Sequence, residues 1–224
     1  MAITRSLTRA GSSAEETTLT DIFRGLFPQE SAAPMHVQPR TYVFHQGTDV
    51  EAVFLSTRGS LVLERIDEDG RMAMFGMQKA GALLAWQDLL DGAVHRNSGQ
   101  TLTACDLVVV TRDKFETALR ENEGLLLALM RQAASQANSY EEHIFRLSTL
   151  DVPERLYWTL FSLAGSPEDS ETVEVNTPLM KRDLAALVGT SPETISRSLR
   201  RLEKMKVAEF TKKNTFRIMP PKRD

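Results

Sequence analysis

The chain has 224 residues, of which 42% are hydrophobic and 25% charged, so it is long enough for one large or two small domains with a substantial core. Its single cysteine, Cys105, excludes an internal disulfide framework and a metal site made of cysteines alone. No stretch is long and apolar enough to span a membrane, and the first residues lack the apolar segment of a secretory signal. We therefore expect a cytoplasmic protein without a membrane partner.

The N-terminal half divides into an arm, a short helix and a strand-rich segment. Residues 1–20, rich in Ser, Thr, Ala and Gly, are expected to form a flexible arm. The run Leu19–Leu26 predicts a short helix with Thr20 as its cap. Within 21–112, runs rich in Val, Phe, Leu and Tyr predict strands, separated by glycine-containing turns, at 41–44, 52–55, 60–66, 72–77 and 107–110. Short strands at this spacing predict a β-sandwich or barrel.

A helical segment follows at 113–150, with a break at 122–124. Six residues in its second part step by 3, 4, 3, 4 and 3 positions, which is the spacing of an a/d seam: Met130, Ala133, Ala137, Tyr140, Ile144 and Leu147. The neighbouring residues are polar, and the two alanines would let helices approach closely. This pattern favours a two-fold helix–helix homodimer. The alternative is an amphipathic helix packed on its own domain.

The segment 151–224 begins at a hinge. Asp151, with Glu154 three residues later, matches a capping box with Asp in place of Ser or Thr, and predicts a helix that continues to about Ala164. Beyond this helix we expect a polar loop, a strand, and a hairpin or wing with lysines at its tip, at 165–170, 171–175 and 207–219.

Between the loop and the wing, residues 177–204 carry the pattern of two helices joined by a tight turn. The first helix is predicted at 178–188, with Thr177 as its cap, and ends at Gly189, a residue suited to the left-handed conformation. Ser191 is expected to cap the second helix, with Pro192 in the first helical position. Apolar residues recur at helical spacing in both: Leu179, Leu184, Leu187 and Val188, then Ile195, Leu199 and Leu202.

The outer face of the second helix is polar and mostly basic. Glu193, Ser196 and Arg197 lie at i, i+3 and i+4, so they share one face near the start of the helix. Residues 177–223 contain 12 Lys/Arg against 4 Asp/Glu, a net charge of +8, whereas the whole chain carries −3. These features predict a helix-turn-helix that binds double-stranded DNA. The alternative is a solvated charged helix that only packs on its neighbour.

The run LAALVGTSPETISRSLRRLEK resembles the helix-turn-helix of the CRP/FNR family of bacterial transcription regulators. Its E-T-I-S-R core is similar to the FNR branch, because the CRP branch has an arginine where this chain has Pro192. The resemblance implies an α+β fold: an arm (1–20), a β-roll sensor domain like that of cyclic-nucleotide-binding proteins (21–112), a dimerisation helix (113–150) and a winged helix-turn-helix domain (151–224). His45-Gln46-Gly47 falls where that roll has a turn of the same sequence.

The resemblance also implies how DNA would be recognised. The FNR branch implies a homodimer on an inverted repeat like TTGAT-N4-ATCAA, read by Glu193, Ser196 and Arg197. Arg197 would bind the guanine, Glu193 a cytosine amino group and Ser196 a thymine. Phosphates would be bound by Arg200, Lys212 and Lys213. RNA polymerase is a further partner if the protein is an activator.

The nucleotide-binding cassette of the family is altered in this chain. Its Gly-Glu pair falls on Ala85-Trp86 and its arginine on Arg96, or on His95 with another gap, so the ribose-binding glutamate is missing. The Thr-Ser pair that reaches the adenine in cyclic-AMP-binding members falls on Tyr140-Glu141. We therefore expect cyclic AMP not to bind. Another effector would lie between the roll and the dimer helix, in a pocket with Trp86, Arg96 and Tyr140.

The sequence also bears on other cofactors and functions. The iron–sulfur cluster of the FNR branch needs four cysteines, and this chain has one. Haem stays open as a gas-sensing group, although the scattered spacing singles out none of the histidines, His36, His45, His95 and His143. One rival is a constitutive DNA-binding dimer whose roll is a scaffold. The other is an enzyme, which is not predicted because the chain has no phosphate-binding Gly loop, metal-ligand cluster or nucleophile motif.

Overall fold

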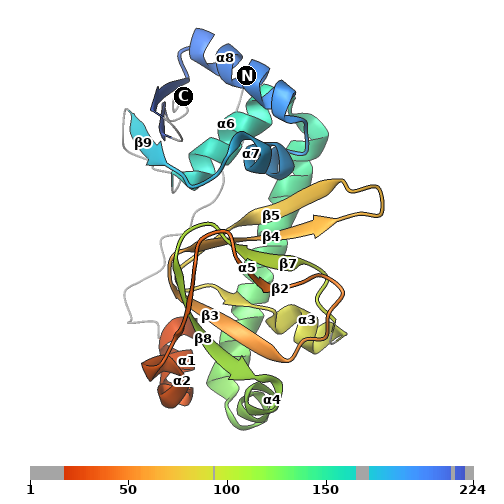
Figure 1. Cartoon of the computed structure of the whole chain (residues 1–224), viewed down its shortest axis with the longest axis vertical. Helices are drawn as coiled ribbons and strands as arrows, with labels where there is room; N and C mark the ends of the chain where they lie inside the picture. Colours follow the sequence, from red (N-terminus) through yellow and green to blue (C-terminus); the bar gives the residue numbers. More distant parts are fainter. Residues whose placement is uncertain (1–17, 93, 165–171, 213–214, 220–224) are drawn as a thin grey trace.

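A computed structural model describes residues 18–92, 94–164, 172–212 and 215–219. The arm expected at 1–20 therefore lies outside these ranges except for its last three residues, as do Lys213 and the loop expected at 165–170. Two β-sheets form a roll, a long helix runs beside it, and a smaller domain of helices with a third sheet lies at one end (Figure 1). This is the expected α+β architecture.

The roll is built of two four-stranded antiparallel sheets, in the orders β1-β8-β3-β6 and β2-β7-β4-β5. The strands are β1 (Met35–Val37), β2 (Tyr42–Phe44), β3 (Ala52–Arg58), β4 (Ser60–Ile66), β5 (Met72–Lys79), β6 (Leu83–Leu84), β7 (Ser98–Thr101) and β8 (Cys105–Thr111). The five predicted runs correspond to β2, β3, β4, β5 and β8. The strands β1, β6 and β7, two to four residues long, have no counterpart among those runs.

Three short helices accompany the roll: α1 (Leu19–Leu26), α2 (Pro28–Ala32) and α3 (Trp86–Asp91). The bounds predicted for α1 are confirmed, but the expected cap is wrong. Thr18, not Thr20, precedes the helix, and its hydroxyl accepts from the amide of Asp21 at 3.2 Å while the Asp21 carboxylate accepts from the Thr18 amide. Thr20 lies inside the first turn, where its side chain cannot cap.

One turn of the roll can hold only glycine. Gly59 joins β3 to β4 with a φ of 91°, in the left-handed region. A Cβ at this position would lie 2.3 Å from the carbonyl oxygen of Ala104 and 2.6 Å from the sulfur of Cys105. The lone cysteine is thus 1% exposed against this hairpin and acts as a small core residue.

The helical segment after the roll divides at Asn122 into α4 (Arg112–Glu121) and α5 (Glu123–Thr149). The break was predicted, and Asn122 explains it: its side chain accepts from the amide of Leu125 at 2.7 Å and so caps a new helix. Leu125 and Leu129 of α5 are buried beside Phe23 of α1 and Phe115 of α4 in the roll's core. No other residue of α5 is buried, so most of this long helix lies on the surface.

The C-terminal domain contains α6 (Val152–Leu163), β9 (Val173–Asn176), α7 (Lys181–Val188), α8 (Pro192–Lys204), β10 (Ala208–Lys212) and β11 (Thr215–Ile218). The three strands form one antiparallel sheet in the order β10-β11-β9. The predicted capping box of α6 is present: the Glu154 amide donates to Asp151 at 3.0 Å, and the Asp151 amide donates to Glu154 at 2.9 Å. The three helices and the hairpin therefore follow the expected order.

The start of α7 differs from the prediction. The helix begins at Lys181, three residues after the expected Pro178, and Thr177 does not cap it. Instead, the Asp183 carboxylate accepts from the amide of Met180 at 2.8 Å, while the Thr177 hydroxyl accepts from the amide of Leu179. Asp183, in the first turn of α7, therefore makes the capping interaction that was expected from Thr177.

The two domains share an apolar contact. Val62, Met74 and Leu102 of the roll are buried in the same cluster as the helix-turn-helix core, with Met72 and Met77 at its edge. In Figure 1, α7 lies between α8 and strands β4 and β5, so the first helix of the pair is the one that faces the roll. Among the described helices, none combines the length and the apolarity that crossing a membrane requires.

Candidate nucleic-acid interface

The turn between α7 and α8 follows the predicted chemistry. Gly189 adopts a φ of 72°, and its amide and that of Thr190 both donate to the carbonyl of Ala185, which ends α7. The Ser191 hydroxyl accepts from the amide of Thr194 at 3.3 Å, and Pro192 occupies the first position of α8. Local residue choices therefore determine where α7 ends and where α8 begins.

One face of α8 is packed inside the domain. Ile195, Leu199 and Leu202 are at most 6% exposed, and Ser198 lies buried beside them. They pack with Leu184 and Val188 of α7, and with α6, in the second core cluster. This burial fixes which side of α8 faces outward.

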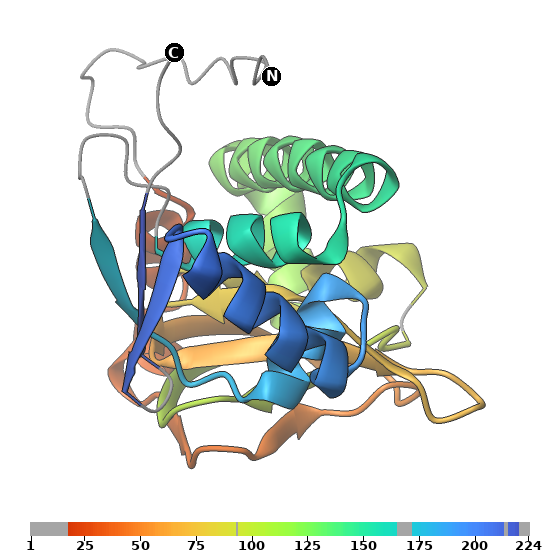
Figure 2. The same cartoon turned by 90° about the horizontal axis from the view of Figure 1, so that it is seen from above.

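The predicted base-reading residues lie together at the outward N-terminal end of α8. Glu193 and Arg197 are exposed, and Ser196 between them is half-buried, with its hydroxyl donating to the carbonyl of Pro192 at 3.1 Å. Hydrogen bonds from the backbone at its own position and from Ser191 lower the pKa of Glu193, with a smaller contribution from Arg197. Glu193 is thus an ionised acceptor at neutral pH, next to a guanidinium donor. Figure 2 views the molecule from above, and α8 lies in front of the strands of the roll.

The residues predicted to bind phosphates are placed only in part. Arg200 is exposed on the outer side of α8, one turn after Ser196. Lys212 is the last residue of β10, at the wing, and Lys213 falls outside the described residues. Arg201, the next residue along α8, has another role, since its guanidinium lies 3.1 Å from the carboxylate of Asp151 at the hinge.

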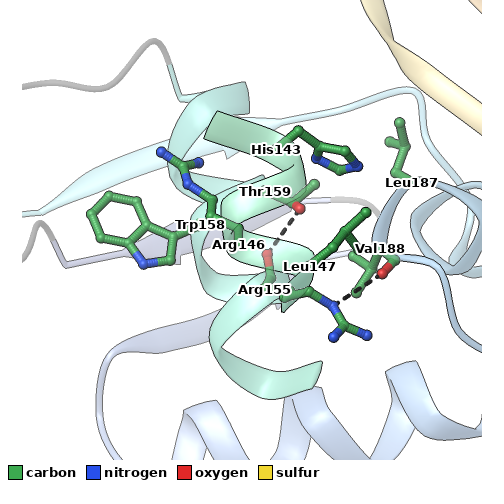
Figure 3. Close-up of a pocket in the computed structure, with 8 residues that line it drawn as sticks. All are labelled: His143, Arg146, Leu147, Arg155, Trp158, Thr159, Leu187 and Val188. Atoms are coloured by element: carbon green, nitrogen blue, oxygen red, sulfur yellow. Dashed lines mark hydrogen bonds between the residues drawn. The ribbon is translucent and has the colours of Figure 1, made fainter. Parts of the chain in front are cut away.

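A small pocket lies where the end of α5 meets α6 and α7 (Figure 3). The Arg155 guanidinium in this pocket donates to the carbonyls of Leu150 at 3.1 Å and of Val188 at 3.3 Å, which ties the hinge to the helix-turn-helix. The Arg146 guanidinium of α5 lies 4.8 Å from the ring centroid of Trp158 in α6. These contacts join the last turns of α5 and the hinge to α6 and to the end of α7, and sequence patterns gave no signal for them.

The candidate effector residues differ in exposure, because Trp86 is buried whereas Arg96 and Tyr140 are exposed. Trp86 begins α3 and is only 5% exposed, and its indole N–H has no hydrogen-bond partner among the described residues. The Arg96 guanidinium is paired with Asp88 at 2.9 Å and with Asp91 at 3.2 Å. Its pKa is raised mainly by the hydrogen bond to Asp88, with Tyr140 of α5 among the smaller contributors, so Arg96 and Tyr140 lie within electrostatic range. Trp86, in contrast, is buried.

Ala85, at the position expected for the cassette glycine, has an uncommon backbone conformation. Ala85 has a φ of 65°, in the left-handed region that glycine favours, and is 5% exposed. Its neighbour Gln87 donates to Gln136 of α5 at 2.6 Å, which joins α3 to the long helix. Ala85 therefore has the backbone conformation of a glycine site, and its side chain and that of Trp86 are buried.

Two of the four histidines, His36 and His95, have different surroundings. His95 is 3% exposed and stacks on Phe44 with ring centroids 4.3 Å apart, whereas His36 is exposed and paired with Asp106 at 2.5 Å. Across the described ranges, no group of three or more His, Cys, Asp or Glu side chains could hold a metal ion.

Comparisons with known proteins agree with this architecture. The sequence model of the cyclic nucleotide-binding domain matches residues 34–122, and that of the Crp-like helix-turn-helix domain matches 154–223. The chain is 25% identical over 195 residues to the cAMP-activated global transcriptional regulator CRP of Haemophilus influenzae, covering 86% of each chain. It is also 25% identical to the nitrogen fixation regulation protein FixK of Azorhizobium caulinodans, covering 82% of this chain and 78% of FixK.

Solved structures share the fold at lower identity. The c-di-GMP-responsive global regulator CLP of Xanthomonas campestris superimposes with a TM-score of 0.74 at 20% identity, over 88% of this chain and 99% of CLP. FixK2 of Bradyrhizobium japonicum superimposes with a TM-score of 0.72 at 18% identity, over 84% of this chain and 91% of FixK2. With a cyclic nucleotide-binding roll and a Crp-like helix-turn-helix matched in this order, the chain belongs to the CRP/FNR family of transcription regulators.

Proposed function

We propose that the protein is a homodimer that binds double-stranded DNA at an inverted repeat resembling TTGAT-N4-ATCAA, and that it is not an enzyme. One observation carries the proposal: α8 buries Ile195 and Leu199 and leaves Glu193 and Arg197 exposed at its N-terminal end. In helix-turn-helix proteins this end of the second helix contacts base edges in the major groove.

The chemistry of the exposed residues supports a role for each. The Arg197 guanidinium can donate two parallel hydrogen bonds to O6 and N7 of guanine, and an ionised Glu193 can accept from the cytosine amino group. Since the Ser196 hydroxyl donates to the carbonyl of Pro192, its Cβ would contact the C5-methyl group of a thymine. Contacts to phosphates would come from Arg200, Lys212 and Lys213 and would carry no sequence information.

The exposed seam of α5 supports the homodimer. Met130 and Ile144 are each 62% exposed, Tyr140 is 50% and Leu147 is 42%, with Ala133 and Ala137 exposed between them. An apolar stripe of this length on a monomer's surface fits a partner helix with the same stripe, related by a two-fold axis. If the protein activates transcription, the dimer would also contact RNA polymerase.

A small ligand other than cyclic AMP would bind between the roll and α5, near Trp86, Arg96 and Tyr140, where the unpaired indole N–H would gain a partner. Haem is the alternative group, and its Soret band in the absorption spectrum of the purified protein would identify it.

A second candidate is a constitutive DNA-binding dimer whose roll is a ligand-free scaffold. The observation that favours it is the Arg96 guanidinium, which Asp88 and Asp91 already neutralise, so that a cyclic phosphate would meet two carboxylates there. Titration calorimetry with cyclic AMP tests both candidates. Saturable micromolar binding of cyclic AMP would contradict the proposal of another effector as well as the proposal of a ligand-free scaffold.

Selection from random DNA tests the main proposal. The purified protein should enrich an inverted repeat with TTGAT-like half-sites and a four-base-pair spacer. Enrichment of a different repeat would remove the FNR-like assignment, and failure to enrich any sequence would remove the proposed function.

A further inference from the structure

One arginine of the roll reaches into the helix-turn-helix. The Arg40 Nη2 donates to the carbonyl of Pro178 at 2.9 Å and to the carboxylate of Asp183 at 2.8 Å. The residues of this pair are 143 positions apart, and both side chains are largely enclosed, at 26% exposed for Arg40 and 1% for Asp183. This contact is a charged clamp between the two domains.

Asp183 serves two structures at once. The oxygen that binds Arg40 also accepts from the amide of Met180, so the carboxylate that begins α7 is the one that attaches α7 to the roll. A carboxylate with so little exposure needs a partner, because burying an unpaired charge is costly. The position of α7 is therefore linked to the position of Arg40.

The backbone of Arg40 is held in an uncommon conformation. Its φ is 60°, in the left-handed region, which L-residues other than glycine seldom occupy. The Arg40 amide donates to the carbonyl of Thr101 at 2.8 Å, and the fully buried Thr101 hydroxyl bonds the neighbouring loop at Gln38 and Thr41. The roll thus keeps a strained residue in place, and the side chain so aimed contacts the other domain.

The surface around the clamp is apolar and adaptable. Met74 of β5 is buried at the interface, with Met72 and Met77 beside it, and these flexible side chains can fill a gap in several arrangements. Apolar burial is non-directional, so it holds the domains together without fixing their relative orientation. The two hydrogen bonds of the Arg40 guanidinium are directional and supply that orientation.

We propose that Arg40 is a positioning residue for DNA reading: by clamping Pro178 and Asp183 it sets the orientation of α8 and thereby the spacing of the two recognition helices in a dimer. This inference rests on the proposed function. The clamp binds the side of the helix pair that faces the roll, while Glu193 and Arg197 stay exposed, so Arg40 itself would contact no DNA (Figure 1).

The test compares binding to inverted repeats with spacers of three, four and five base pairs, and to a single half-site, for the wild type and for Arg40→Ala. The wild type should prefer one spacer. We expect Arg40→Ala to reduce that preference by about fivefold or more while binding to the half-site is unchanged. The residues of α8 proposed to contact bases are intact in this variant, and only the orientation of α8 relative to the roll is less fixed. Arg58→Ala is the control: it removes a roll arginine paired within its own domain, with Asp106, and should keep the wild-type profile.

Two further variants remove the contact between Arg40 and Asp183 while keeping the local structure at the substituted position. Arg40→Gly removes the clamp but suits the left-handed backbone, and Asp183→Asn removes the charge but keeps an oxygen for the Met180 amide. Both should give the Arg40→Ala profile, and the double variant should add nothing further. Unchanged spacer preference in folded Arg40→Gly would overturn the inference while leaving the proposed function intact. No DNA binding by the wild type would remove both.

Discussion

Asp151 binds Arg201 while it caps α6: one carboxylate oxygen accepts from the amide of Glu154 at 3.0 Å and the other lies 3.1 Å from the Arg201 guanidinium of α8. Asp151 follows Leu150, the C-cap of α5. One side chain therefore joins the end of the long helix, the first turn of α6 and the helix that is proposed to read DNA.

The two functions of Asp151 can be separated by substitution. Asp151→Ala should lower the free energy of unfolding by about 1 kcal/mol, because it removes the cap. Asp151→Ser keeps a capping oxygen and should recover most of that loss. Arg201→Ala removes only the ion pair, whose side chains are 59% and 46% exposed, and should cost about 0.5 kcal/mol or less. Urea unfolding of the three variants measures this, and equal losses for Ala and Ser would show that the cap is not the stabilising element.

Gly59 should be far less tolerant of a side chain than Gly70. Both have left-handed backbones, with φ of 91° and 76°, so alanine costs about 1–2 kcal/mol at either. At Gly59 the new Cβ would also clash with Ala104 and Cys105, adding about 1–3 kcal/mol, whereas nothing lies within 4 Å at Gly70. Denaturant midpoints should therefore fall much further for Gly59→Ala. Equal shifts would contradict the close approach of the β3–β4 turn to Ala104.

Ile144→Glu tests the seam of α5. The substitution would place an unpaired charge in the proposed dimer interface, which should cost several kcal/mol and dissociate the dimer. Ser135→Glu is the matched control, because Ser135 is exposed on the same helix but lies outside the seam spacing. Sedimentation should report monomers for the first variant and dimers for the second. A dimeric Ile144→Glu protein would place the interface elsewhere.

Base and phosphate contacts should separate by sequence dependence. Arg197→Ala should lose about 1–3 kcal/mol per half-site and relax the preference for guanine. Arg200→Ala should weaken all sequences alike and reduce the slope of log affinity against log salt by about one unit. Competition assays at several salt concentrations measure both effects. A uniform loss for Arg197→Ala would assign it to the backbone instead.

The buried His95 should make the protein less stable in acid. Burial lowers the pKa of His95, although Asp88 nearby partly opposes this. The folded state therefore disfavours the protonated ring, and stability contributed by the neutral form is lost as the pH falls below the ordinary histidine value of about 6.5. His95→Gln should show a smaller fall in the free energy of unfolding between pH 7 and pH 5. An identical pH dependence would mean that His95 does not contribute to it.

Much of the fold is determined by residues close together in the sequence. The capping of α6 by Asp151 and Glu154 and of α8 by Ser191 involves hydrogen bonds three positions apart, which a linear pattern displays. Gly189 and Pro192 act on their own backbone angles. The buried and exposed faces of α8 follow from its 3.6-residue period, and for this reason the outward position of Glu193 and Arg197 could be predicted.

Only the tertiary structure decided which distant groups meet. The start of α7 depends on Asp183, which is both a cap and the partner of Arg40 from the other domain, and no local pattern encodes a contact across 143 positions. The pairing of Arg96 with Asp88 and the burial of Trp86 likewise depend on how α3 packs against the roll. Capping and periodicity act within a few residues of the sequence. The contact between Arg40 and Asp183 and the burial of Trp86 instead arise from packing between elements that come together only on folding.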